Sequence, residues 1–169
     1  SPKAVANQKA VLADEDYITQ CRAQGFYPLG YYPHNIHFIW LSASFAGRSE
    51  LALAMADKTA SVIPDATLAQ MPMLQSFKVV PLYARIQFQR WDDLLAQDKP
   101  AYDLAFYRGI WHYGRGLARI ATAPNDLAQA QAELAALQAI LAQPDLNATP
   151  ATSSANTATH LLHIAERVL

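Results

Sequence analysis

This sequence has one cysteine, no cluster of positive charge and no long apolar run. These absences argue against an internal disulfide, nucleic-acid binding and a membrane span, respectively. The single cysteine, Cys21, cannot form a disulfide within the chain, and its helical surroundings predict a small core residue. The formal net charge is -1 without a Lys/Arg block, so nucleic-acid binding by phosphate neutralisation is not expected. Because no run of about 18 apolar residues occurs, these 169 residues contain no predicted membrane span.

Strand patterns and catalytic motifs are also missing. Residues 78–80 (Lys-Val-Val) have some β character, but Pro81 follows them and no partner strand exists. The serines at 42, 44 and 49 lack a Gly-x-Ser-x-Gly context, so no hydrolase nucleophile is predicted. Hydrophobic residues make up 52% of the chain and charged residues 16%, which predicts a packed core. We therefore expect an all-α protein without catalysis.

What the chain does contain is a helix-turn-helix unit. Its clearest copy covers residues 34–64, with a turn at Gly47-Arg48 between two apolar helices. Such a unit needs a neighbour stacked on its apolar side, which favours an α-solenoid. Equivalent turn positions at Gly47, Gln89 and Ala123 lie 42 and 34 residues apart, near the tetratricopeptide period of about 34 residues. The sequence thus predicts antiparallel helix pairs stacked as a tetratricopeptide-like α-solenoid with a right-handed superhelix.

One domain over residues 1–169 is expected, with helix pairs over 35–63, 79–98 and 102–142, flanked by helices of incomplete repeats over 2–22 and 155–169. Asn35 is the expected N-cap of the second helix, after a rigid loop over 25–33 whose prolines and glycines exclude a helix. Pro64 and Pro72 leave a helical turn and irregular chain over 64–77. Neither end shows a polar capping repeat, an initiator Met or a signal peptide, so we expect an internal excerpt of a longer protein.

Several strings extend this interpretation by resemblance. The string Tyr31-Tyr32-Pro33-His34-Asn35-Ile36-His37-Phe38, followed by Ala46-Gly47-Arg48-Ser49, resembles the central region of a family of bacterial tetratricopeptide-repeat proteins. Residues 13–17 (Ala-Asp-Glu-Asp-Tyr), 88–95 (Phe-Gln-Arg-Trp-Asp-Asp-Leu-Leu) and 112–118 (His-Tyr-Gly-Arg-Gly-Leu-Ala) look like further landmarks. The resemblance implies more repeats on both sides and no particular reaction, cofactor or ligand. Gln89, where a turn glycine is expected, and Ala123-Pro124-Asn125 depart from the family pattern.

The polar residues of the aromatic string are the best site candidates. His34 and His37 share a helix face at i,i+3 spacing, and Tyr31 precedes them. They suit a ligand or metal pocket, or else His34 and Asn35 tie the loop to the helix by side-chain hydrogen bonds. The structural alternative is favoured, because no Cys, Asp or Glu stands in register to complete a metal site.

A second group lies on the helix expected to end at Thr122. Arg108, His112 and Arg115 fall at i, i+4 and i+7, on one stripe. That stripe suits a carboxylate or an acidic peptide tail, which Arg binds bidentately. The alternative is a set of structural ion pairs, for which the available carboxylates are Asp92, Asp93 and Asp103.

These features predict a non-catalytic interaction module that presents a concave surface to a protein or peptide partner. No cofactor or metal is expected, and the binding residues are Tyr31, His34, Asn35, His37, Arg108, His112 and Arg115. The rival function is a metal- or small-molecule-binding protein or an enzyme, whose pocket requires His34, Asn35, His37 and His112 to converge. A third alternative is a structural spacer whose exposed terminal helices mediate self-association.

Overall fold

The structure is a computed structural model that describes residues 2–21, 27–100, 104–144, 146 and 156–169. Those residues form helices and contain no β-strand, so the all-α prediction is confirmed. No helix within the described ranges is long and apolar enough to span a membrane. The helical elements are α1 (Pro2–Cys21), η1 (a π-helical turn, Tyr27–Tyr31), α2 (Tyr32–Phe45), α3 (Ser49–Ser61), α4 (Asp65–Leu68), η2 (a 3₁₀ turn, Pro72–Leu74), α5 (Gln75–Lys78), α6 (Val80–Gln87), α7 (Trp91–Ala96), α8 (Ala105–Thr122), α9 (Ala128–Leu141) and α10 (Ala158–Val168).

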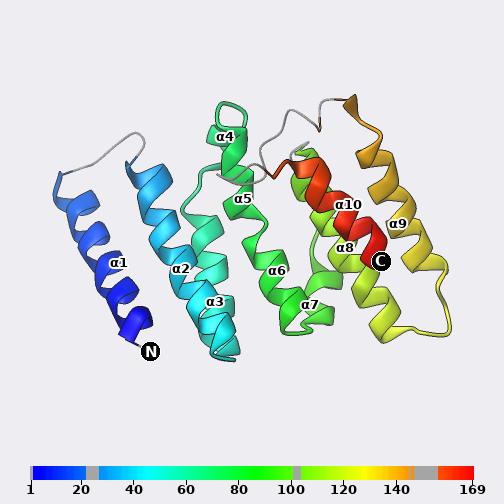
Figure 1. Cartoon of the computed structure of the whole chain (residues 1–169), viewed down its shortest axis with the longest axis horizontal. Coiled ribbons are helices and arrows are strands. Elements are labelled where there is room, and N and C mark those ends of the chain that lie inside the picture. The colour runs from blue at the N-terminus through cyan, green and yellow to red at the C-terminus, as the bar shows by residue number, and fades with distance from the viewer. Residues whose placement is uncertain (1, 22–26, 101–103, 145, 147–155) are drawn as a thin grey trace.

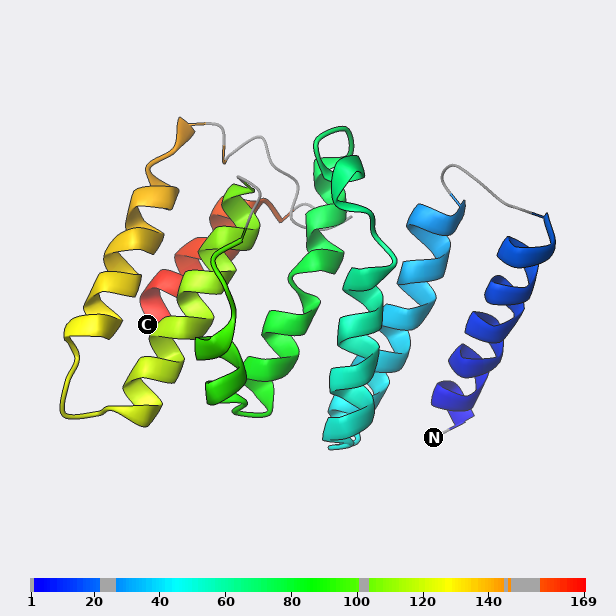
Figure 2. The ribbon, with the colours of Figure 1, turned by 180° about the vertical axis from the view of Figure 1, so that it is seen from behind.

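The longer helices stand side by side in a row, with the N-terminus at one end and α9 and α10 at the other (Figure 1). Contacts follow the order of the chain: α1 packs on α2, α2 on α3, α3 on α6, α6 on α8, and α8 on both α9 and α10. Seen from behind, the same row is continuous, and α4 projects at its upper edge (Figure 2). The helices of each expected pair, α2/α3, α6/α7 and α8/α9, are in contact.

The core consists of successive apolar clusters along the row. One cluster joins α1 to α2 around Ile36, a second joins α2, α3 and α6 around Ala52, and the largest surrounds α8 around Phe106. Partly buried side chains connect neighbouring clusters, Met55 between the first and second and Tyr83 between the second and third. Each helix therefore buries its apolar face mainly against its immediate neighbours.

Two inter-helix turns share one backbone conformation. After α2, the Gly47 N–H donates to the carbonyl three residues earlier (3.1 Å) and the Arg48 N–H to the carbonyl five residues earlier (2.9 Å). After α6, Gln89 and Arg90 repeat both bonds at 3.1 Å and 2.8 Å. The φ angles are +67° at Gly47 and +53° at Gln89, so both turns are glycine-type helix C-caps. The third expected turn differs: Ala123 has φ -138° and ψ 64°, because the proline that follows it disfavours the α region.

Two glycines of α8, Gly109 and Gly116, are points of close approach to α10 and to Leu169, which follows it. A Cβ built on Gly109 would lie 2.6 Å from the Cδ atoms of Leu162, and one on Gly116 would lie 2.6 Å from those of Leu169. The two glycines are seven residues apart, and so are the two leucines that they face. The later glycine faces the later leucine, so the two segments run in the same direction. Helices α8 and α10 therefore pack in parallel, and the missing side chains on α8 accommodate the leucines of α10.

Four local predictions are wrong. The expected loop over 25–33 is a π-helical turn from residue 27, and α2 already starts at Tyr32. Pro33 lies in the first turn of α2, where a backbone N–H would have no helical acceptor, so its absence costs nothing. Asn35 is thus inside the helix and is not its N-cap. Cys21 is exposed at the end of α1, not part of the core. Residues 64–77 are more helical than expected, with α4, η2 and the start of α5 between Pro64 and Phe77.

Candidate functional site

A groove of about 630 Å³ lies on the face formed by α2, the η2–α5–α6 segment, α8 and α10. Its lining is dominated by aromatic and aliphatic side chains. Among the described residues that line it, none is Asp, Glu, Lys or Arg. The lining residues are Gly30, Tyr31, His34, His37, Phe38, Trp40, Met73, Leu74, Ser76, Phe77, Val79, Val80, Tyr83, Phe106 and Leu161.

Helix α2 places both expected histidines in this groove. Because α2 begins at Tyr32, His34, His37 and Phe38 share one helix face at i, i+3 and i+4. The His34 ring centroid is 4.7 Å from that of Phe38, edge to face, and the His37 ring is 4.8 Å from Trp40. The sequence predicts that His34 and His37 share one helix face, and both side chains line the groove.

The surroundings of His37 keep its ring uncharged at neutral pH. Its ring lies between Trp40 on α2 and Phe77 on α5, with centroid distances of 4.8 Å and 6.1 Å. Burial, with a smaller contribution from the neighbouring His34, lowers the pKa of His37 to about 4. At pH 7 the imidazole is a neutral aromatic surface with one donor and one acceptor nitrogen.

Tyr31 completes the part of the site that the sequence predicted. It ends η1, is 58% exposed and lies in the groove lining beside His34. Three of the seven predicted binding residues, Tyr31, His34 and His37, are thus brought together on one groove.

Asn35 points elsewhere and joins α2 to α1. Its Nδ2 donates to Asp14 Oδ2 at 2.7 Å, while the Tyr27 hydroxyl donates to Asp14 Oδ1 at 2.7 Å. Asp14 itself is only 5% exposed, so its carboxylate depends on these donors. The side-chain hydrogen bonds expected of Asn35 exist, but the partner is a carboxylate of the preceding helix.

The neighbouring Glu15 forms a second polar connection to the same region. It accepts from the Tyr32 hydroxyl at 2.9 Å and forms an ion pair with Lys58 of α3. The Lys58 hydrogen bond first, and that of Tyr32 second, hold the pKa of Glu15 below its ordinary value. Residues 13–17 thus hold the aromatic string of residues 31–38 in place through Asp14 and Glu15. Their sequence pattern did not reveal this structural role.

His112 and Arg115 form a separate cluster between α8 and α9. His112 Nδ1 lies 2.7 Å from Glu133 Oε2, and Arg115 Nε donates to Glu133 Oε1 at 2.8 Å. Burial raises the pKa of Glu133, but hydrogen bonds from His112 and Arg115 outweigh that effect and hold the pKa below its ordinary value. Arg115 also donates to the Leu95 carbonyl (3.0 Å), and its guanidinium carbon lies 4.5 Å from the centre of the Trp111 ring.

For His112 and Arg115, the expectation that Asp92, Asp93 or Asp103 supplies the carboxylate is corrected. Glu133 is the carboxylate that His112 and Arg115 share, because α9 returns along α8 and brings Glu133 opposite them. Asp93 instead pairs with Arg90 (3.0 Å), and Asp103 lies outside the described residues.

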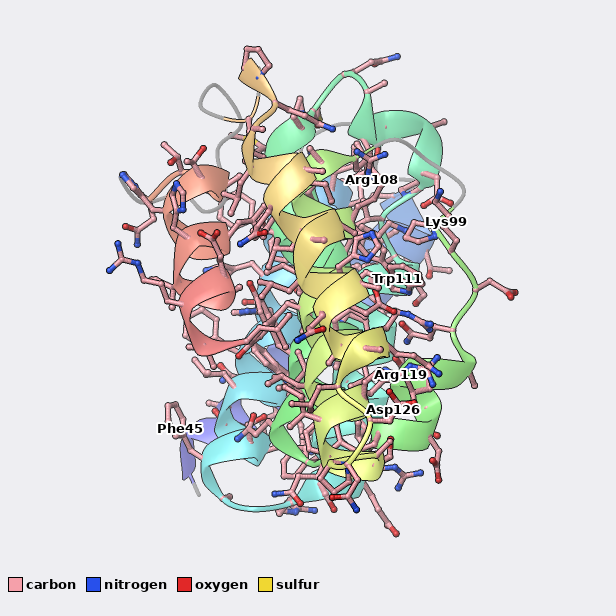
Figure 3. The ribbon with its side chains drawn as sticks, turned by 90° about the vertical axis from the view of Figure 1, so that its right-hand side faces the viewer. Phe45, Lys99, Arg108, Trp111, Arg119 and Asp126 are labelled. Atoms are coloured by element: carbon pink, nitrogen blue, oxygen red, sulfur yellow. The ribbon has the colours of Figure 1, made fainter. Side chains whose placement is uncertain are left out.

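Arg108 does not line the groove either. Figure 3 shows Arg108, Trp111 and Arg119 on the side of α8 that faces away from α10, whereas Phe106 and Leu161, which line the groove, come from α8 and α10. None of Arg108, His112 and Arg115, the basic stripe of α8, lines the groove, so the groove and this stripe are distinct surfaces. Asn35 and His112 are both outside the groove lining, so the four residues of the rival pocket are not brought together there.

Sequence reasoning missed most of the groove wall. Much of it comes from η2 and α5, in the segment 64–77 for which the sequence predicts a helical turn and irregular chain. Val79 and Val80, at the expected start of a helix pair, add to it. Phe106 and Leu161 come from helices far along the chain. The large apolar residues between Pro72 and Tyr83 were the available signal, but they do not show which helix this segment packs against.

No group of three or more His, Cys, Asp or Glu side chains among the described residues is arranged to hold a metal ion. Comparison with protein-family models, curated proteins and solved structures finds no match to this chain.

Proposed function

We propose that this chain is a tetratricopeptide-like helical-repeat module that binds a segment of a protein or peptide partner along the groove, without catalysis. The observation that carries the proposal is the groove itself. Helices α2, α6, α8 and α10 all contribute to its wall, so a segment lying in it would contact successive helices. Extended surfaces of this kind are what stacked helix pairs use to bind partners.

Three features support the repeat architecture in this proposal. The turns at Gly47 and Gln89 have the same hydrogen bonds and lie 42 residues apart. The core is divided into successive clusters, as expected when each repeat contacts only its neighbours. Helix α8 packs in parallel on α10, the relation between corresponding helices of adjacent pairs. A right-handed superhelix follows from the proposal and remains a prediction.

A peptide library displayed on phage tests the proposed function. Random 12-residue peptides are selected on the 169-residue protein, and enriched sequences are synthesised and titrated by calorimetry. The variant Phe38→Ala removes a groove side chain that is 40% exposed, and Phe45→Ala removes an 85% exposed phenylalanine of the same helix outside the groove. A residue central to binding typically costs more than about 1 kcal/mol when truncated, so we expect Phe38→Ala to weaken binding about tenfold.

The Phe45→Ala control is expected to bind like the wild type. Absence of any reproducibly enriched peptide, or equal losses in the two variants, would contradict the proposal. Self-association stays a separate prediction: Leu12 on α1 is 65% exposed and Ile164 on α10 is 60% exposed.

A further inference from the structure

We propose that the groove is a docking site for a peptide segment that inserts an uncharged aromatic side chain between α2 and the α5–α6 segment. The inference rests on the proposed function and adds the chemistry of the group that is recognised. Charge, ring geometry and size each restrict what the groove accepts.

The charge of the lining excludes an ionic anchor. None of the described lining residues is acidic, and none is Lys or Arg, so neither a carboxylate nor an ammonium group would find an opposite charge there. His37 is held neutral by its burial, which lowers its pKa to about 4. A charged side chain entering the groove would lose its hydration without a compensating ion pair, whereas an uncharged one would not.

The rings of the wall favour an aromatic anchor over an aliphatic one. Phe38 forms edge-to-face pairs with both His34 and His37, at 4.7 Å and 6.2 Å, and His37 forms another with Phe77 at 6.1 Å. These are the separations at which aromatic rings attract one another beyond simple burial. Phe38 remains 40% exposed at the edge of this set, so an inserted ring would continue the ring packing and cover it.

The extent of the groove favours a peptide over a free small molecule. Its volume of about 630 Å³ lies within the range of about 300–1,000 Å³ of small-molecule sites, so the spread of the lining decides between the two. The lining extends from Tyr31 before α2 to Leu161 on α10. A chain segment that anchors one ring near His37 has further apolar wall on both sides for its neighbouring residues.

Four fluorescein-labelled peptide libraries test the anchor. Each has a fixed central residue, Trp, Leu, Asp or Lys, in otherwise random 11-residue peptides, and binding to the 169-residue protein is measured by anisotropy at pH 7.5. We expect the Trp library to bind at least about tenfold more tightly than the Asp and Lys libraries, and more tightly than the Leu library. Phe38→Ala should remove that preference, and Phe45→Ala should keep it.

The outcomes separate the two proposals. If no library binds, the proposed function fails together with this inference. If the Asp, Lys or Leu library binds best and Phe38→Ala weakens it, the module function stands and the aromatic anchor is wrong. If free N-acetyltryptophanamide binds as tightly as the Trp peptides, the groove is a small-molecule site and peptide docking is overturned.

Folding of the variants is checked by circular dichroism. If Phe38→Ala loses its helical spectrum, Ser76→Trp replaces it, because Ser76 is a half-buried lining residue on α5 and a bulky ring there fills the groove. Loss of Trp-library binding in Ser76→Trp supports the inference, and unchanged binding overturns it.

Discussion

Among the residues that the structure describes, Gln89 is the one non-glycine residue with a left-handed backbone conformation, at φ +53°. It occupies the turn between α6 and α7, in the position that Gly47 takes between α2 and α3. The side chain of Gln89 is exposed, so replacing it removes no core packing. We predict that Gln89→Gly stabilises the protein.

The magnitude follows from two opposing terms. The left-handed conformation costs a non-glycine residue about 1–2 kcal/mol, and glycine removes that cost. Glycine also loses more backbone entropy on folding, which costs about 0.5–1 kcal/mol. The net expectation for Gln89→Gly is a gain of about 0.5–1 kcal/mol in the free energy of unfolding. For Gly47→Ala the same terms act in reverse, with a loss of similar size, since a Cβ there meets no atom within 4 Å.

Urea denaturation followed by circular dichroism measures both variants. The midpoints should shift in opposite directions while the slope of free energy against urea stays constant, because neither change alters the surface exposed on unfolding. A Gln89→Gly variant that is no more stable than the wild type, beside a destabilised Gly47→Ala, would refute the equivalence of the two turns.

Three other perturbations have defined outcomes. Gly109→Ala should lower the thermal midpoint, because the added Cβ would lie 2.6 Å from the fully buried Leu162. The cost of overpacking, about 1–3 kcal/mol, exceeds the gain in helix propensity of about 1 kcal/mol. Gly116→Ala should be near neutral, because the leucine that it faces is partly exposed. Asp14→Ala leaves a tyrosine hydroxyl and an asparagine amide without their acceptor, and chemical denaturation should show a loss of about 1–3 kcal/mol. Burial lowers the pKa of His37 to about 4 from 6.5, so between these pH values the folded protein binds fewer protons than the unfolded chain. The free energy of unfolding should therefore fall by up to roughly 3 kcal/mol as the pH drops from 6.5 to 4. The variant His37→Phe should flatten that part of the curve of stability against pH.

The helices were largely predictable because their signals are local. Turn residues, prolines and apolar spacing located the ends of α3, α6 and α9 within a few residues. The start of α2 is not evident from Pro33, because proline breaks a helix in its interior but is compatible with a first turn. The exposure of Cys21 depended on where α1 packs, which its own neighbours in sequence do not determine.

The candidate site was predictable only in part. The i,i+3 spacing of His34 and His37 sufficed to place them on one face, and both line the groove. The partners of the other residues come from remote segments: Asp14 for Asn35, and Glu133 for His112 and Arg115. A short-range pattern cannot identify such partners, because each depends on which helix packs alongside.

Local signals were enough to predict that this chain is helical, where most of its turns fall and that two imidazoles share one side of α2, because propensity, capping and periodicity act over a few residues. Three features follow from tertiary packing: η2 and α5 fold against α2, α10 packs onto Gly109 of α8, and Glu133 of α9 lies between His112 and Arg115. Those outcomes depend on contacts between residues far apart in the chain, whose geometry is set by the packing of whole helices.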